Sequence, residues 1–467
     1  MRIRLTILLM VLMTALVSAQ DFSERQEIAI FRLSYFGQPE VEVRREVEFR
    51  VVGRGPLTIV LRGTGVERYD QLFDRAFAAI ESDIQEVFVS LGRFTVIGMQ
   101  QRLTQESVSD FIDVLSEFQL NDQLPEPVLL GQQPFTEADF RRIAGDFIVI
   151  VPSVTWYDLN RTDSGDFIAT IETSFSFLDV ATGRTFDQFS INTSGTSEDA
   201  SGAVRQAVEE IPAELSFRVR SMERFRIRTG VLEVNGSEVL VEFGRDMGLV
   251  PGEEYAIIQD RVLANGRIVS GETGLLLIRD VQSDFSYAQI LYAVPSVQPG
   301  DQLREVPRRG IETELYLDVM TDGVSNVTYI AGLQGTVSRG FYDFRPFAAF
   351  EIPFRGLVGN ALLPMNLRLG GEWNLFLGRL RLTPSGSIGV GGAVPLSDDP
   401  VYDPFYLSHL GVSARISGSL MVTRDILVEV QTGLGWWQSL VSTSAASPGN
   451  ALSTYGGLII GGGVTFK

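Results

Sequence analysis

The stretch YGGLIIGGGVTFK, residues 455–467, decides how the second half of the chain is interpreted. Its aliphatic and aromatic side chains recur at every second position, and a period of two is typical of a β-strand. One face carries Leu458, Ile460, Gly462, Val464 and Phe466, and the other carries Gly457, Ile459, Gly461, Gly463 and Thr465. The stretch therefore predicts a strand with one apolar face and one glycine-rich face that leaves room for neighbouring side chains.

Seven further segments of alternating character precede this one. The eight segments are 311–320, 327–338, 341–352, 364–377, 379–394, 406–422, 425–437 and 455–466. Each reaches or exceeds the ~9–11 residues that a tilted membrane strand needs. Across the eight segments taken together, one face contains no charged residue, and the opposite face contains charged residues of both signs. Alternation alone does not say which face points inward.

The charged face supplies the candidate site residues, and we expect them to form a structural charge network in a barrel lumen. They are Glu312, Arg345, Glu351, Arg368, Glu372, Arg381, His409, Arg415 and Glu429, with Glu314, Asp318 and Asp343 on the same face. Which of them pair is not readable from the sequence. His409, the only histidine, is expected to be a hydrogen-bonding group, because it has no second histidine with which to bind a metal.

The connections between the segments alternate in length. Those after the first, third, fifth and seventh segments are long, and those after the second, fourth and sixth are short. Long external loops, tight periplasmic turns and an even strand count are typical of outer-membrane barrels. The eight segments thus resemble an OmpA-type eight-stranded outer-membrane β-barrel, which implies that both barrel ends face the periplasm. A small soluble β domain is the alternative interpretation.

The first 19 residues have the pattern of a secretory signal peptide. Arg2 and Arg4 precede an apolar run, and Val17-Ser18-Ala19 offers a small-residue cleavage site. The alternative is an uncleaved anchor, but the run is shorter than the ~20 residues of a spanning helix. We expect cleavage near Ala19.

The composition excludes several function classes. The chain has no cysteine and a net charge of −19, which rules out thiolate chemistry and disfavours nucleic-acid binding. There is no Ser-His-Asp set, P-loop or HExxH motif, and the glycines of 386–392 have the wrong spacing for nucleotide binding. The acidic stretches 163–166 and 397–400 do not complete a calcium loop. We expect a non-enzymatic protein with no catalytic residues, no cofactor and no metal.

Residues 20–222 alternate between strand and helix patterns. Three phrases, GRFTVI (92–97), DFIVIVPSVTWYD (146–158) and SFLDVATGRT (176–185), resemble the CsgG-like (curli-secretion) periplasmic domain. The resemblance implies an α/β periplasmic domain. The chain departs from the secretion channel because it lacks a lipidation cysteine and carries its own barrel. VEVRREVEFRVV (41–52) is expected to be a soluble hairpin, since Arg45 interrupts its apolar face, so channel function does not carry over.

Residues 223–306 are rich in turn residues. Asn235-Gly236, Pro251-Gly252 and VQPGDQL (297–303) separate short strand patterns. This region resembles the C-terminal domain of the flagellar protein FlgT, which implies a small all-β domain without catalytic residues. Residues 307–467 then form the barrel.

The sequence therefore predicts a multi-domain chain: signal peptide, α/β periplasmic domain, small all-β domain and C-terminal eight-stranded antiparallel transmembrane β-barrel. We expect it in the outer membrane of a diderm bacterium, with residues 20–306 in the periplasm. The expected function is an envelope scaffold or assembly protein. The alternative is a subunit of an oligomeric secretion or transport channel. Expected partners are outer-membrane lipid and periplasmic or envelope proteins, with the cell wall as a further candidate; no nucleic-acid partner is expected. The oligomeric state stays open.

Overall fold

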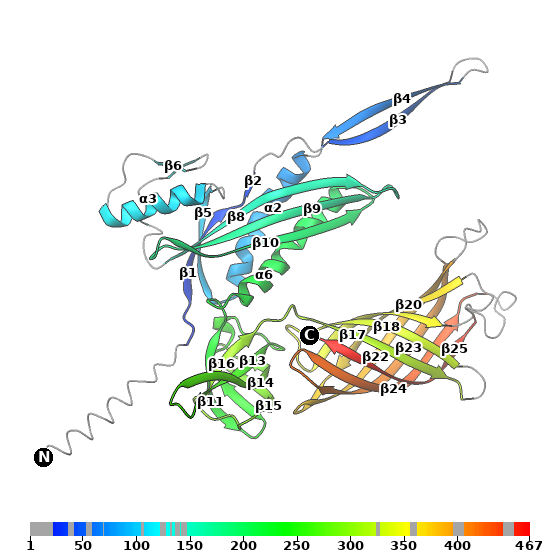
Figure 1. Ribbon diagram of the computed structural model, residues 1–467. Coiled ribbons are helices and arrows are strands. Elements are labelled where there is room, and N and C mark those ends of the chain that lie inside the picture. The colour runs from blue at the N-terminus through cyan, green and yellow to red at the C-terminus, as the bar shows by residue number, and fades with distance from the viewer. Residues whose placement is uncertain are drawn as a thin grey trace. The chain divides into compact units, whose positions relative to one another are not determined.

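The structure is a computed structural model (Figure 1). It describes residues 22–35, 42–52, 58–68, 70–103, 107–121, 128–130, 133–135, 141, 147–323, 327–354, 362–395, 406–441 and 453–467. Two compact units divide the chain: Glu24–Phe225, called the α/β domain, and Arg226–Lys467 together with the residues up to Ser23. The expected signal peptide lies outside the described residues.

The α/β domain is built on one mixed sheet. Its strands are β1 (Gln26–Arg32), β2 (Ser34–Tyr35), β5 (Phe94–Arg102), β8 (Ile148–Arg161), β9 (Phe167–Asp179) and β10 (Arg184–Ser197). The order is β10-β9-β8-β1-β5, with β2 beside β8. β1 runs parallel to both β5 and β8, whereas β8, β9 and β10 form an antiparallel meander. The meander leaves β10 at one edge of the sheet.

Helices cover both faces of this sheet (Figure 1). They are α2 (Asp70–Ser90), α3 (Ser107–Asn121), α5 (Ala200–Glu209) and α6 (Ile211–Ser221). α2, α5 and α6 bury their apolar residues against one face, and α3 packs on the other. α5 and α6 are separate helices, because Pro212 lies in the first turn of α6 and cannot continue a preceding helix.

Two further antiparallel pairs lie within the described residues of this unit. They are β3 (Glu42–Val52) with β4 (Thr58–Arg68), and β6 (Val128–Leu130) with β7 (Gln133–Phe135). The segment 41–52, expected to be a whole hairpin, supplies only the first strand of one, and its partner strand is β4. No described helix is long and apolar enough to cross a membrane.

The second unit begins with a closed six-stranded barrel. Its strands are β11 (Arg228–Asn235), β12 (Glu238–Val241), β13 (Glu254–Val262), β14 (Ile268–Val281), β15 (Ser286–Ala293) and β16 (Gln302–Val306), with the 3-10 turn η1 (Arg245–Met247) between β12 and β13. The closed order is β11-β12-β15-β14-β13-β16. Ser23 belongs here, since its amide donates to the Arg228 carbonyl at 2.9 Å. Turn glycines with positive φ, such as Gly236 and Gly252, connect the strands.

An eight-stranded antiparallel barrel follows. Its strands are β17 (Ile311–Thr321), β18 (Val327–Val337), β19 (Phe344–Phe354), β20 (Leu362–Trp373), β22 (Leu380–Pro395), β23 (Tyr406–Met421), β24 (Ile426–Ser439) and β25 (Tyr455–Phe466), with β21 (Leu375–Leu377) beside β22. Neighbouring strands pair in sequence, and β25 closes the cylinder on β17 with Phe466 opposite Thr313. The first strand therefore begins and the last strand ends at the same rim of the barrel, which we call the near rim.

The expected closed eight-stranded barrel is confirmed, with two irregularities: the register between β22 and β23 shifts at Gly391 and Gly392, and the fourth segment is broken. The fourth segment was expected to run unbroken to Leu377, but it breaks at Asn374. The Asn374 side chain is buried, with its carbonyl oxygen accepting from Thr383 Oγ1, and β21 continues by pairing with β22 alone. The long connections expected after the odd-numbered segments lie largely outside the described residues.

Candidate functional site

The outward face of the eight-stranded barrel is apolar. Alternate residues along each strand are exposed aliphatic or aromatic side chains; Leu317 and Val430 are each 69% exposed. Charged side chains of the same strands, such as Arg368 and Glu351, are 2% and 0% exposed. A barrel in water has the opposite arrangement, because exposing this much apolar surface costs free energy. The arrangement fits a hydrocarbon surrounding.

The middle of the lumen is organised around Glu351 on β19. Its Oε1 lies 2.9 Å from Arg368 Nε and 2.7 Å from an Arg415 guanidinium nitrogen, and it accepts the Tyr316 hydroxyl at 2.8 Å. Arg415 also reaches Asp318 at 2.9 Å, and Arg368 donates to the Tyr316 hydroxyl at 2.9 Å. Two acids and two bases are therefore balanced here in a charge-assisted network.

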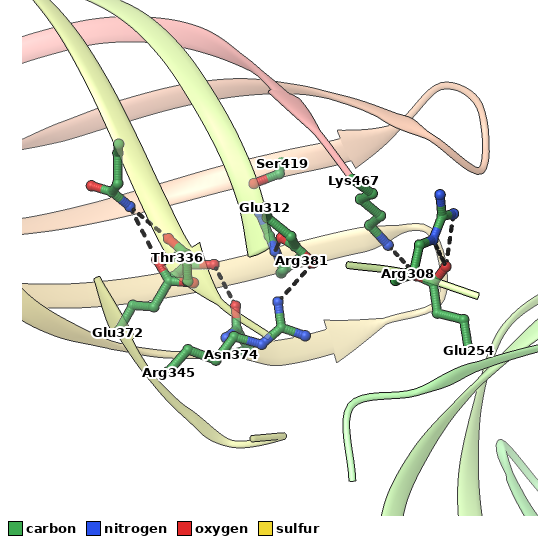
Figure 2. A network of polar contacts seen from close by, with 12 residues as sticks. Glu254, Arg308, Glu312, Thr336, Arg345, Glu372, Asn374, Arg381, Ser419 and Lys467 are labelled. Atoms are coloured by element: carbon green, nitrogen blue, oxygen red, sulfur yellow. Dashed lines mark hydrogen bonds and ion pairs between the residues drawn. The ribbon is translucent and has the colours of Figure 1, made fainter. Parts of the chain in front are cut away.

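A second layer of ion pairs lies between the Glu351 network and the near rim (Figure 2). Glu312 on β17 is bound by Arg345 at 3.0 Å and by Arg381 at 2.8 Å, one arginine on each of its oxygens. Arg381 also lies 3.9 Å from Glu429, which accepts a hydrogen bond from Ser419. Strands far apart around the barrel are thus connected through its interior.

This layer borders a small cavity. About 20 Å³ is open to the centre of a water molecule, which is space for one or a few waters. Glu314 and Glu372 are among its lining residues, and Glu372 accepts from Gln334 at 3.4 Å. Glu314 Oε1 is buried with no hydrogen-bond partner in the structure, so water in the cavity is the available partner. Among the described residues, no group of three or more acidic or histidine side chains is arranged to hold a metal.

The far end of the lumen is closed by aromatic and apolar side chains. Trp437 is 1% exposed and stacks on Tyr455, with ring centroids 6.1 Å apart. His409 is 1% exposed; its Nε2 donates to the Ser453 carbonyl at 3.1 Å, and its ring meets that of Tyr455 edge-on. The neighbouring Trp436 is 54% exposed and points outward. The Trp-Trp pair therefore contributes one ring to the lumen and one to the outer surface.

All nine residues expected in the lumen network are buried on the inward face. They are Glu312, Arg345, Glu351, Arg368, Glu372, Arg381, His409, Arg415 and Glu429. The structure joins Glu312 with Arg345 and Arg381, and Glu351 with Arg368 and Arg415. His409 lies apart from these ion pairs, at the far end. Tyr316 also belongs to this network and was not predicted, although it lies four positions after Glu312 on β17 and therefore on the same inward face.

In the α/β domain, the Asp179 side chain stabilises the turn after β9. Asp179 accepts hydrogen bonds from the amide and hydroxyl of Thr182 and pairs with Arg224 at 2.6 Å. Burial raises the pKa of the Asp179 carboxyl, but these partners lower it by more, so the net shift is downward. Gly183 closes the turn with φ of 60°. These residues, part of the phrase that carries the CsgG-like resemblance, stabilise a turn.

Comparison with known proteins gives limited similarity. No protein-family model and no curated protein matches the chain. Neisserial surface protein A matches at 8% identity over 34% of this chain and 95% of its own, with a TM-score of 0.25. A protein from Xanthomonas campestris matches at 10% identity over 42% of this chain and 86% of its own, with a TM-score of 0.22. The outer membrane protein OmpT of Vibrio cholerae matches at 10% identity over 68% of this chain and 96% of its own, with a TM-score of 0.16.

The geometry of the barrel itself defines the class. Eight antiparallel strands form a closed cylinder, the outward face is apolar, and the charges are buried inside. These properties together are those of an outer-membrane β-barrel. The resemblances to the CsgG-like and FlgT domains stay predictions.

Proposed function

We propose that the chain is a non-enzymatic scaffold or assembly protein of the cell envelope, in which the barrel anchors periplasmic interaction domains. The observation that carries the proposal is the filled lumen. The Glu351 network, the Glu312 layer and the Trp437–Tyr455 stack occupy three levels of the interior. An eight-stranded barrel has room for side chains but not for a channel, so its role here is to hold the chain in the membrane.

The orientation follows from the barrel ends. Because β17 begins and β25 ends at the near rim, everything before Ile311 starts from that side. The near rim also carries the tight turns, which face the periplasm in outer-membrane barrels. We therefore infer that residues 20–306 lie in the periplasm of a diderm bacterium. Fractionation, with gel mobility compared before and after heating, tests this; recovery in the soluble periplasm would contradict it.

A partner site is available on the α/β domain. Edge strand β10 is 14 residues long and, within the described part of the sheet, pairs with β9 alone. Its alternate residues Asn192 and Ser194 are exposed. An edge strand can accept a strand from a partner through main-chain hydrogen bonds. Because most of the chain's net negative charge precedes Ile311, a partner with a basic surface is favoured.

In-cell photo-crosslinking tests the scaffold proposal. A photoreactive residue at Asn192 should capture a specific envelope protein, identified by mass spectrometry. The same residue at the exposed Asp163, in the β8–β9 turn, is the matched control and should capture it much less. Equal capture from both sites, or capture of no other protein, would contradict a partner site on β10.

The alternative function is an oligomeric secretion or transport channel. Only the length of the β3–β4 hairpin favours it: each strand has 11 residues, the length of a membrane strand, whereas Arg45 interrupts the apolar face of β3. Particle size separates the two functions: a channel ring should run as a large oligomer in detergent, whereas a scaffold can be a monomer. A stable ring formed by the protein, together with loss of export on deletion while the envelope stays intact, would replace the scaffold proposal.

A further inference from the structure

The six-stranded barrel contacts the near rim of the eight-stranded barrel at several of its turns. In the turn after β18, Arg339 Nε donates to Glu253 Oε1 at 3.1 Å and the Gly340 amide donates to the Pro251 carbonyl at 2.8 Å. In the turn after β23, Arg424 pairs with Glu272 at 2.8 Å. These contacts hold the rim at separate points around its circumference.

The third tight turn, after β21, makes a different contact. The Arg379 guanidinium lies over the Tyr292 ring, 4.4 Å from its centroid. A cation over an aromatic face is attracted by the ring quadrupole. All three tight turns of the near rim therefore contact the six-stranded barrel.

The centre of this contact is apolar. A single cluster of buried side chains joins Ala256, Leu275, Leu277, Leu291 and Val306 of the six-stranded barrel with Met421 and Leu427 of the eight-stranded barrel. Met421 and Leu427 are 4% and 2% exposed. They end β23 and begin β24, at the mouth of the lumen. An apolar centre surrounded by polar contacts is the usual organisation of a stable protein interface.

Glu254, at the start of β13, binds the chain segment just before the first strand of the eight-stranded barrel and the segment just after its last strand (Figure 2). Its Oε1 lies 2.5 Å from Lys467 Nζ, directly after β25. Its Oε2 accepts from Arg308, just before β17, at 2.9 Å. Arg308 also binds Asp425 at 2.5 Å, and the Lys467 amide donates to the Asp425 carbonyl at 3.1 Å. One buried carboxylate therefore connects the segments flanking the first and last strands.

The ion pairs of Glu254 are largely shielded from solvent. Glu254 and Lys467 side chains are 3% and 5% exposed. Burial lowers the pKa of Arg308, but the charges of Glu254 and Asp425 raise it by more, so the net shift is upward. Removing Glu254 would leave two cations near one another without their common partner, which is costly in a buried place.

We propose that this face of the six-stranded barrel is a docking surface for the chain's own eight-stranded barrel, and that Glu254 clamps the β17–β25 seam by binding Arg308 and Lys467 together. The seam joins strands that lie at opposite ends of the barrel sequence, so its closure costs more chain entropy than a hairpin does. The clamp offsets part of that cost, and the apolar centre covers the mouth of the lumen.

Lys467 is the only lysine of the chain, which gives the proposal a direct test. The full-length protein, folded in detergent micelles, is treated with an amine-acylating reagent, and mass spectrometry follows the modification of Lys467. Slow acylation is expected in the wild type. Glu254→Gln, which removes the charge and keeps the shape, should raise the rate about tenfold or more, since hydrogen bonds to charged groups contribute that much.

Glu233→Gln is the matched control, because Glu233 is exposed on β11 of the same barrel; its Lys467 rate should equal that of the wild type. If wild-type Lys467 is acylated as fast as in the urea-unfolded chain, or if Glu254→Gln changes nothing, the clamp is wrong.

A second measurement covers the case in which Glu254→Gln does not fold. Lys467→Met removes the ammonium group, and Lys467→Arg keeps a cation. The temperature at which the heat-modifiable gel band converts to the unfolded form should fall for Lys467→Met and stay near the wild-type value for Lys467→Arg. Equal temperatures for the wild type and Lys467→Met would overturn the proposal.

Discussion

The acidic side chains of the lumen differ in the number of hydrogen-bond and ion-pair partners that each one has. Glu351 is fully buried and accepts from two arginines and a tyrosine hydroxyl. Its removal would leave Arg368 without an acidic partner and Arg415 with Asp318 alone among the ion pairs described. A buried charge without its partner is far more costly than a lost neutral hydrogen bond.

We therefore predict that Glu351→Ala lowers the free energy of unfolding by about 3–5 kcal/mol. Tyr316→Phe removes only the hydroxyl that shares the network and should cost about 1 kcal/mol. Urea unfolding in micelles, followed by tryptophan fluorescence, measures both, because Trp437 is buried in the same lumen. Equal small effects of the two substitutions would show that the ion pairs contribute little.

Asp179 supplies a pH-dependent prediction for the α/β domain. Its folded pKa is lower than its unfolded value, because Arg224 and Thr182 outweigh the effect of burial. A depressed carboxyl pKa gives stability that is present above the unfolded value and is lost as the pH falls through the folded value. We expect the calorimetric transition of this domain to shift downward below about pH 4.

Asp179→Asn tests the cause of that shift. Asparagine can still accept from the Thr182 amide, but it carries no charge for Arg224. At pH 7 the variant should be about 1 kcal/mol less stable than the wild type, and the difference should shrink as the pH falls. A constant difference at pH 7 and pH 3 would show that the charge of Asp179 is not responsible.

At the scale of single elements, β25 closes the barrel because of its glycines. A Cβ at Gly461 would overlap Asp318 Oδ1 and the carbonyl oxygen of Leu317 on β17. Gly461→Ala should therefore cost about 1–3 kcal/mol by overpacking the seam. Gly386→Ala on β22 is the matched control, since a Cβ there meets nothing within 4 Å. The same urea experiment applies; equal costs for both glycines would exclude the steric explanation.

The alternation of side chains was enough to predict the barrel strands, because one face meets lipid and the other a polar lumen. It did not predict the partners of Glu351, since pairing depends on how eight strands stagger around the cylinder. The break at Asn374 was not predicted either, because the alternation of side chains with a period of two continues through it. Glu254 was missed for another reason: nothing near it in sequence indicates that its partners, Arg308 and Lys467, lie 54 and 213 positions away.

At the scale of the molecule, the second unit consists of two closed barrels in contact. Closure pairs the strands of both barrels around their circumference and leaves only short unpaired edges, at the β13–β14 hairpin and at β21, whereas the sheet of the α/β domain ends in β10. Among the described residues, β10 offers a longer free edge, because all 14 of its residues lack a strand on the outer side. This division agrees with the proposed roles, in which the barrels anchor the chain and the α/β domain binds partners.

A filled lumen also predicts the electrical behaviour of the protein. The ion pairs of Glu351 and Glu312 cross the interior, the cavity beside them holds only about 20 Å³, and Trp437 with Tyr455 closes the far end. A hydrated ion has no continuous path through such a core. Planar-bilayer recording of the purified monomer should therefore show no large stable conductance, while a porin recorded in the same bilayer supplies the positive control. A steady porin-like current from the monomer would mean that the barrel conducts, and the anchoring role would then have to be abandoned for transport.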